Sequence, residues 1–144
     1  MSTHLTTSAL ETGLPAIQQS PSDNGALLAI VRRPATNSRE ELAEADLDTA
    51  LGLVGDSWKG SRFEKADNQL TLINTRAIDL IAGCRDRWAL AGDQLYVDLD
   101  LSHENLPPGT RLEIGSTLIE ITADIFAKTD PDTGNPKLVL TRSV

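Results

Sequence analysis

The chain has 144 residues, and 40% of them are hydrophobic, which provides for one packed domain rather than global disorder. Its 13 basic and 21 acidic residues give a net charge of −8. This balance argues against binding to duplex nucleic acid or to anionic membranes, because both need a basic surface. Cys84 is the only cysteine, which excludes an intrachain disulfide and a cysteine-rich zinc site. Without an apolar run long enough for a membrane span or a signal peptide, the sequence favours a soluble, cytoplasmic protein.

The N-terminal part of the chain divides at about residue 25. Residues 1–25 are rich in Ser and Thr and lack a sustained hydrophobic period, which predicts a disordered leader before a single domain over 26–144. The apolar run at 26–33 predicts a first strand, which Pro34 ends. The Ser-x-x-Glu pattern that follows is that of a capping box, so we expect a short acidic helix or turn over 38–45.

The middle of the chain predicts a strand and a helix. Residues 51–56 form a compact apolar segment with two glycines, and the polar residues 57–68 are typical of a loop. A strand is expected at 69–73. The apolar spacing that follows predicts a helix that is capped by Asn74 or Thr75 and ends near Ala82, with Gly83 as its stop signal.

The C-terminal part of the chain predicts strands. Strict alternation over 95–101 indicates a strand buried on one face, with Tyr96 on the solvent side. Residues 111–121 read as a hairpin whose two-residue turn begins at Gly115. A last short strand is expected at 137–141. The total of about six strands and one or two short helices favours an antiparallel barrel or sandwich.

Three short motifs have catalytic forms, but each has a simpler explanation. Asp132-Thr133-Gly134 has the form found in aspartic proteases, yet its flanking prolines favour a solvated turn. His103 is the only histidine outside the predicted leader and lacks partners for a metal site or a catalytic triad. Cys84 stands beside Arg85, which would favour a thiolate, although a small structural residue is the simpler interpretation.

A group of basic side chains lies in the predicted loop at 57–68. Lys59, Arg62 and Lys65 could together hold an anion such as phosphate. A solvated basic loop in an acidic protein is the simpler alternative, and composition alone favours it.

Several of these segments, taken in order, resemble the MOSC domain, which is found at the C-terminus of molybdenum cofactor sulfurases and in small bacterial proteins. The resemblance runs from about residue 26 to residue 122. Gly-Leu-x-Gly-Asp and Glu-Asn-Leu are each weak alone and fairly specific in this order. The segments that carry it are 51–58, 69–73, 90–101, 104–115 and 118–122.

The resemblance implies a pyruvate-kinase-type β-barrel that handles molybdenum cofactor or sulfur. It implies molybdenum cofactor as the candidate ligand, and a molybdoenzyme or a cysteine desulfurase as the partner. Lys59 and Arg62 are then the expected anion contacts, with Asn105 orienting a polar group. Pyridoxal phosphate belongs to a separate domain of the full sulfurases, so it is not expected in this chain.

The chain departs from the family pattern after about Ala123. The family cysteine falls at Thr129 and the family histidine at Phe126, and threonine is not a soft sulfur ligand. We therefore expect a truncated or degenerate member without catalytic activity. The alternative is a non-catalytic anion- or protein-binding β-barrel module. In either case the missing strands predict an unpaired barrel edge and a homodimer formed through it.

Overall fold

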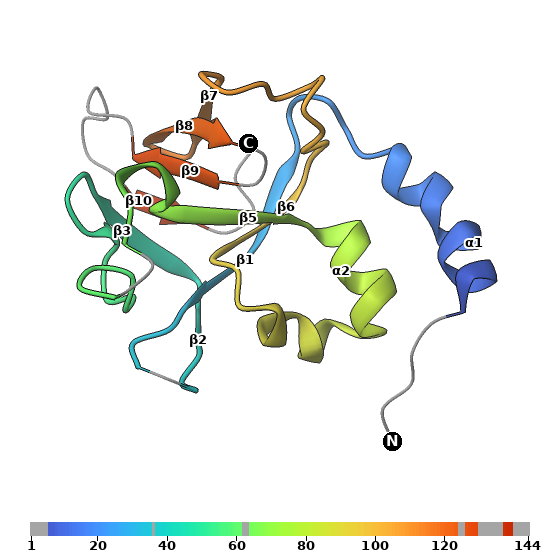
Figure 1. Cartoon of the computed structure of the whole chain (residues 1–144), viewed down its shortest axis with the longest axis horizontal. Coiled ribbons are helices and arrows are strands. Elements are labelled where there is room, and N and C mark those ends of the chain that lie inside the picture. The colour runs from blue at the N-terminus through green and yellow to red at the C-terminus, as the bar shows by residue number, and fades with distance from the viewer. Residues whose placement is uncertain (1–5, 36, 62–63, 124–125, 130–136, 140–144) are drawn as a thin grey trace.

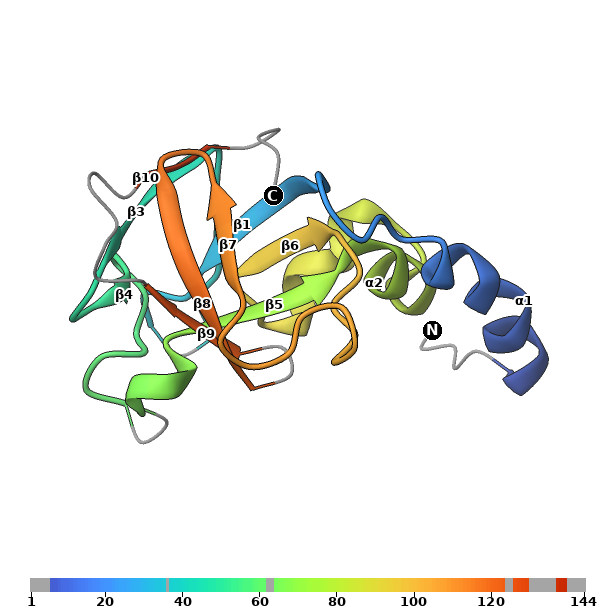
Figure 2. The same cartoon turned by 90° about the horizontal axis from the view of Figure 1, so that it is seen from above.

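The computed structural model describes residues 6–35, 37–61, 64–123, 126–129 and 137–139. The fold is mainly β, as predicted, and its larger sheet is curled into a half-barrel (Figures 1 and 2). That sheet has seven strands in the order β2 (Glu40–Leu42), β1 (Ala26–Arg32), β6 (Leu95–Asp98), β5 (Leu70–Asn74), β9 (Phe126–Thr129), β8 (Thr117–Ala123) and β7 (Arg111–Ile114). A smaller sheet has the order β10 (Lys137–Val139), β3 (Glu44–Asp48) and β4 (Gly52–Leu53).

The helices lie outside the curled sheet (Figure 1). Two of them, α2 (Thr75–Ala82) and the 3₁₀ helix η2 (Arg85–Ala91), connect β5 to β6. These two strands are parallel, whereas the other pairs in the sheets are antiparallel. A parallel pair requires such a crossover connection. The β5–β6 pairing therefore depends on the segment that contains the two helices. Among the described helices, none combines the length and the apolar composition needed to cross a bilayer.

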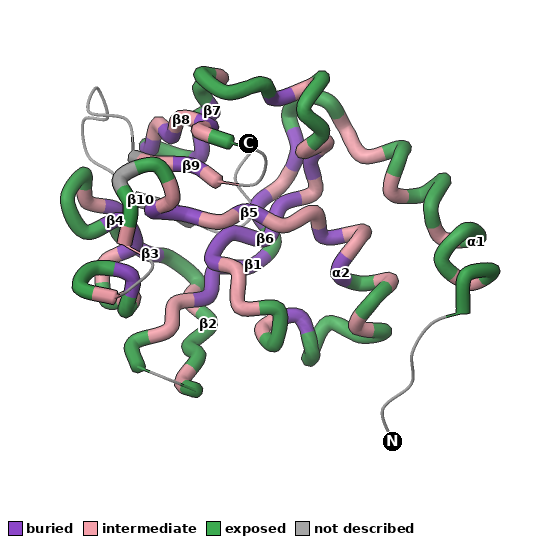
Figure 3. The backbone as a smooth tube through the Cα atoms, viewed as in Figure 1, coloured by how far each residue is buried: buried purple, intermediate pink, exposed green. Residues whose placement is uncertain are grey.

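The central strands are buried on both faces (Figure 3). Inside the curl they contribute to the main core, which contains Leu27, Ile30, Leu70, Leu72, Leu95, Val97, Leu112, Ile114, Ile119 and Ile121. On the outer face a second core forms beneath α2 and η2. There the rings of Trp88 and Tyr96 stack with their centroids 6.1 Å apart, and the Tyr96 hydroxyl donates to the Trp88 carbonyl at 2.9 Å.

The prediction that β6 is buried on one face only is wrong. Tyr96, expected in solvent, is 0% exposed because η2 brings Trp88 over it. The strand also ends at Asp98, earlier than the sequence pattern suggested. Asp98 is only partly exposed, since its carboxylate lies 2.8 Å from Nε of Arg76 on α2.

A register shift in β1 lets this strand serve both cores. Leu27 pairs with Val97, but the next pairing joins Ala29 to Tyr96, so Leu28 is an extra residue on one side. Such a bulge reverses the alternation of side chains beyond it. Consequently Leu27 and Ile30 both lie in the main core, while Ala29 faces the second core.

The helix α2 is confirmed together with its ends. The Asn74 side chain accepts from the amide of Ala77 at 2.9 Å, which caps the first turn. Gly83 follows the last turn with φ of 83°, a left-handed conformation that favours glycine.

The expected acidic helix or turn over 38–45 is wrong, because this region forms β2 and the start of β3. Glu40 lies opposite Arg32 in the β1–β2 ladder, and their side chains form an ion pair at 3.1 Å. In β3 the side chains alternate, with Ala45 and Leu47 buried, which suits a strand better than a helix.

The structure also differs from the predicted disordered leader over 1–25, since a helix α1 spans Thr7–Gln18. None of its residues is buried. It contacts α2 through Gly13, whose missing Cβ makes room for Leu80, and through the Ala16 carbonyl, which accepts from Arg76 at 2.9 Å.

The hairpin at 111–121 is confirmed as β7 and β8, with Gly115 at φ of 61° in its turn. The chain then adds β9 as a separate antiparallel strand beside β8. The last predicted strand is present as β10, which pairs with β3. The predicted turn at 130–136, including Asp132-Thr133-Gly134, lies outside the described residues.

Candidate ligand-binding site

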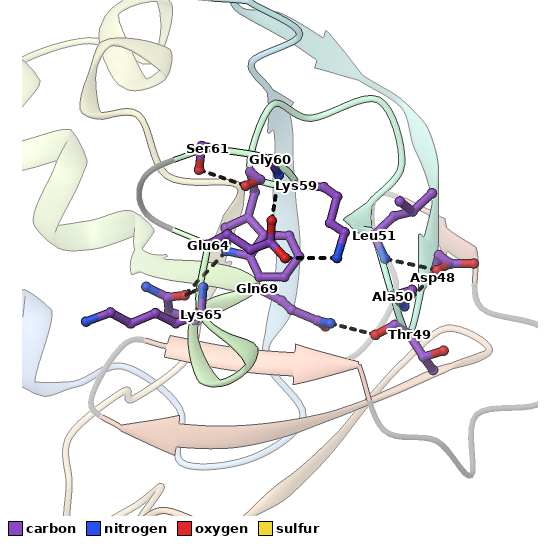
Figure 4. Close-up of polar contacts among 12 residues, drawn as sticks. Asp48, Thr49, Ala50, Leu51, Lys59, Gly60, Ser61, Glu64, Lys65 and Gln69 are labelled. Carbon is purple, nitrogen blue, oxygen red and sulfur yellow. Dashed lines mark hydrogen bonds and ion pairs between the residues drawn. The ribbon is translucent and has the colours of Figure 1, made fainter.

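Lys59, the first predicted anion contact, is already paired within its own loop (Figure 4). Its Nζ lies 2.8 Å from Oε2 of Glu64, and the other oxygen of that carboxylate accepts from the Gly60 amide at 2.6 Å. The hydrogen bond from Lys59, followed by that from Gly60, lowers the pKa of Glu64. Glu64 therefore neutralises Lys59 within the loop.

Other described residues of this loop, which runs between β4 and the 3₁₀ helix η1 (Ala66–Asn68), are also held by local contacts (Figure 4). The Ser61 hydroxyl donates to the Trp58 carbonyl at 2.7 Å. The Trp58 indole donates to the Asn68 side chain at 3.3 Å. Arg62, the second predicted contact, lies outside the described residues.

Asn105, the third predicted contact, holds the backbone in a different loop. Its side-chain amide donates to the carbonyls of Asp100 at 2.8 Å and Ser22 at 2.9 Å. It thus ties the segment before β1 to the segment after β6. No hydrogen bond or ion pair between described residues connects it to the Lys59 loop, and the two loops are well separated in Figure 1.

A second polar group, which the sequence did not single out, gathers around Asp56 just after β4. One carboxylate oxygen accepts from the backbone amide of Arg33 at 2.7 Å. The other accepts from the Trp58 amide at 3.1 Å and from Nε2 of Gln94 at 3.5 Å. Asp56 therefore joins the end of β1 to the loop after β4 and to the start of β6.

Gln94 extends this group to β5. Its buried side chain accepts from the Thr71 amide at 2.8 Å and from the Thr71 hydroxyl. Burial raises the pKa of neighbouring Asp93, against the opposing effects of a hydrogen bond with Thr71 and the charge of Arg33. We call Arg33, Asp56, Thr71, Asp93 and Gln94 the polar cluster.

Arg33 is the cation of the polar cluster, and its side chain is not satisfied there. Its Nε is buried and makes no hydrogen bond to any described residue. Gly92, with φ of 83°, faces the same guanidinium, so that a Cβ at this position would lie 3.3 Å from Nη1. The adjacent Arg32 differs, because it pairs with Glu40 and donates to the Val54 carbonyl at 3.4 Å.

The remaining candidates for sulfur or metal chemistry lie apart from the polar cluster in the chain. Cys84 is exposed at the start of η2, and its neighbour Arg85 pairs with Glu41 at 3.1 Å and lies 4.6 Å above the Trp88 ring. Thr129 ends β9 opposite Ile119. Within the described part of the chain, no group of three or more potential metal-binding side chains occurs.

Comparisons with protein-family models, with curated proteins and with solved structures find no match to this chain. The resemblance to the MOSC domain therefore depends on the motifs and their order alone. What the geometry adds is the position of those motifs. Asp56, Thr71 and Gln94 come from three of the segments that carry the resemblance, and hydrogen bonds connect them in the polar cluster.

Proposed function

We propose that this chain is a non-catalytic, ligand-binding module of the MOSC type that holds molybdenum cofactor or a related sulfur-bearing ligand for a partner protein. The convergence of three motif segments on one polar cluster supports the proposal. The segments that contribute Asp56, Thr71 and Gln94 lie far apart in the sequence, and their side chains satisfy one another. A binding site requires polar groups from different segments to converge in one place.

The residues of the cluster suit one end of such a cofactor and not the other. Arg33 supplies a cation for an ionised group, whereas a molybdenum centre is held by soft sulfur ligands. The single cysteine, Cys84, is exposed at the end of a helix, and Thr129 supplies no thiol. The cofactor would bring its own redox-active metal. The role of this chain would be to bind and orient it, with no sulfur-transfer step of its own.

The proposed partners follow from that role. A molybdoenzyme would receive the ligand, or a cysteine desulfurase would supply sulfur to it. The predicted homodimer through a barrel edge stays a separate proposal. The edge strands of the seven-stranded sheet are β2 and β7, with 3 and 4 residues. Edges this short offer little backbone for strand addition, so we give this proposal less weight.

The direct test is retention of molybdenum cofactor, released from a molybdoenzyme, by the purified chain. We expect retention by the unmodified chain and loss in Asp56→Asn, which removes the charge that joins three parts of the site. Asp86→Asn is the matched control, because Asp86 is an exposed aspartate of η2 outside the polar cluster. Equal retention by both variants, or none by the unmodified chain, would contradict the proposal.

A second measurement tests the non-catalytic part. The chain is incubated with a cysteine desulfurase and its substrate, and the mass of intact protein is measured. We expect no persulfide to be passed from Cys84 to an acceptor. Sulfur accepted at Cys84 and then transferred onward would overturn the non-catalytic assignment, even if cofactor were also retained.

A further inference from the structure

The polar cluster contains a buried donor without an acceptor. Among the described residues, the buried side-chain polar atoms that lack a hydrogen-bond partner are Nε of Arg33 and the hydroxyl oxygen of Thr117. A guanidinium carries a full charge, so leaving its N–H unsatisfied is more unfavourable than leaving a hydroxyl unsatisfied. A native structure with such a group commonly has a water or an ion there.

The neighbouring carboxylates do not fill this role. Both oxygens of Asp56 already accept hydrogen bonds, from the Arg33 and Trp58 amides and from Gln94. Asp93 is close enough for the charge of Arg33 to lower its pKa, but no hydrogen bond connects the two side chains. The guanidinium therefore lies beside these carboxylates without a hydrogen bond from its Nε to either of them.

The guanidinium of Arg33 packs closely against the backbone at Gly92, where a Cβ would lie 3.3 Å from Nη1. Gly92 presents no side chain to the guanidinium, and its φ of 83° is one that other residues adopt only with strain. Arg33 is partly buried, so part of its guanidinium remains accessible while Nε is covered. A planar guanidinium binds a carboxylate, phosphate or sulfate through two parallel hydrogen bonds.

We propose that Arg33 binds a terminal oxyanion of the ligand through the part of its guanidinium that is not covered, next to the polar cluster. This inference rests on the proposed function in so far as it names the part of the ligand that the module recognises. Phosphate, sulfate and carboxylate share the required chemistry, and the experiment distinguishes them. Lys59 has no part in this site, because Glu64 already holds its ammonium group.

The test is a nuclear magnetic resonance titration of the full chain with inorganic phosphate, sulfate or acetate, at ionic strength held constant with chloride. The Nε–H resonance of Arg33 belongs to the same guanidinium and reports on changes in its surroundings. We expect a saturable shift of this resonance and of the Gly92 amide in at least one arm. The anion that binds most tightly identifies the oxyanion.

Two variants separate a specific site from general charge. Arg33→Gln should lose roughly tenfold to hundredfold in affinity, the amount expected for a charged hydrogen bond. Arg33→Lys keeps the positive charge but lacks the planar guanidinium that makes two parallel hydrogen bonds, so it should also bind more weakly. This second variant keeps the test decisive if Arg33→Gln folds poorly. Arg87→Gln is the control, since Arg87 is exposed on η2 outside the cluster. A titration unchanged in both Arg33 variants, or a saturable response confined to the Lys59 loop, would overturn the inference.

The result of this titration can be distinguished from the result of the cofactor-retention test. Cofactor retained by the chain without any anion response at Arg33 would overturn this inference and leave the binding module intact. An anion response at Arg33 in a chain that does not retain cofactor would support the site and contradict the proposed ligand.

Discussion

The Lys59 loop and the polar cluster both bring a cation together with carboxylates, but they are built differently. Lys59 and Glu64 are five residues apart, and their ion pair lies on an exposed loop. Arg33, Asp56 and Gln94 come from separate parts of the chain, and the buried Gln94 joins them to β5. In the Lys59 loop, the cation and the carboxylate pair with each other over a short stretch of chain. In the polar cluster, the Asp56 carboxylate has hydrogen-bond donors on both oxygens, whereas Nε of Arg33 has no acceptor.

This difference indicates where a ligand would be recognised. A surface ion pair such as Lys59–Glu64 contributes little and is easily replaced by water. The backbone of Arg33 is held by the Asp56 carboxylate, so the position of this cation in the fold is set before a ligand binds. The polar cluster is therefore the better candidate for a binding site, although the Lys59 loop is the more basic segment of sequence.

The largest effect is expected from removing the support behind the polar cluster. Tyr96 lies on β6, two residues after Gln94, and packs on Trp88 in the second core. Tyr96→Ala should reduce the free energy of unfolding by about 3–5 kcal/mol, the usual loss for a buried aromatic side chain. Urea denaturation measures this loss. An effect below about 1 kcal/mol, the usual size for a surface position, would mean that β6 is not buried on both faces.

The next effect concerns the carboxylates of the two regions. Asp56→Ala should reduce the free energy of unfolding by about 2–4 kcal/mol, because the amides of Arg33 and Trp58 lose a charged acceptor. Glu64→Ala is the matched comparison and should have a much smaller effect, since its partners are exposed to water. Equal losses in urea denaturation would remove the distinction between the two regions.

The smallest effect is a difference in titration. Burial raises the pKa of Asp93 above 3.8, whereas the hydrogen bond from Lys59 lowers that of Glu64 below 4.5. The contribution of Glu64 to stability is therefore present above pH 4.5 and lost as the pH falls through its folded pKa. That of Asp93 is present below pH 3.8 and lost as the pH rises through its folded pKa. Carboxyl-carbon nuclear magnetic resonance should show both shifts. Lys59→Ala should reduce that of Glu64, where the hydrogen bond from Gly60 remains, and leave that of Asp93 unchanged.

Much of the fold could be predicted where one segment carries its own signal. The apolar run of β1, the helix α2 between Asn74 and Gly83, and the hairpin at Gly115 are specified by local residues. Tyr96 could not be placed, because alternation shows which residues share a face but not whether a helix covers the other one. The short strands β2 and β3 depend on their partners, and a capping-box pattern is weak against strand pairing.

The candidate site was harder to predict for the same reason. Lys59 and Arg62 stand out as charges in a loop, but their sequence neighbours give no warning that Glu64 is bound to Lys59. Arg33 follows Arg32, and the sequence does not separate the arginine that pairs with Glu40 from the one whose Nε stays without a partner. The Gly-Asp pairs at 55–56 and 92–93 were the available signal, since both aspartates lie in the polar cluster.

The most direct test of the central claim is a crystal structure of the chain grown or soaked with phosphate at near-physiological concentration. The account predicts an anion within hydrogen-bond distance of the Nη nitrogens of Arg33, which are not covered as Nε is, with the Lys59–Glu64 ion pair unchanged. An anion bound at Lys59 with the pair broken would contradict it. So would an Arg33 guanidinium fully bonded to Asp93 or Asp56, with no anion beside it.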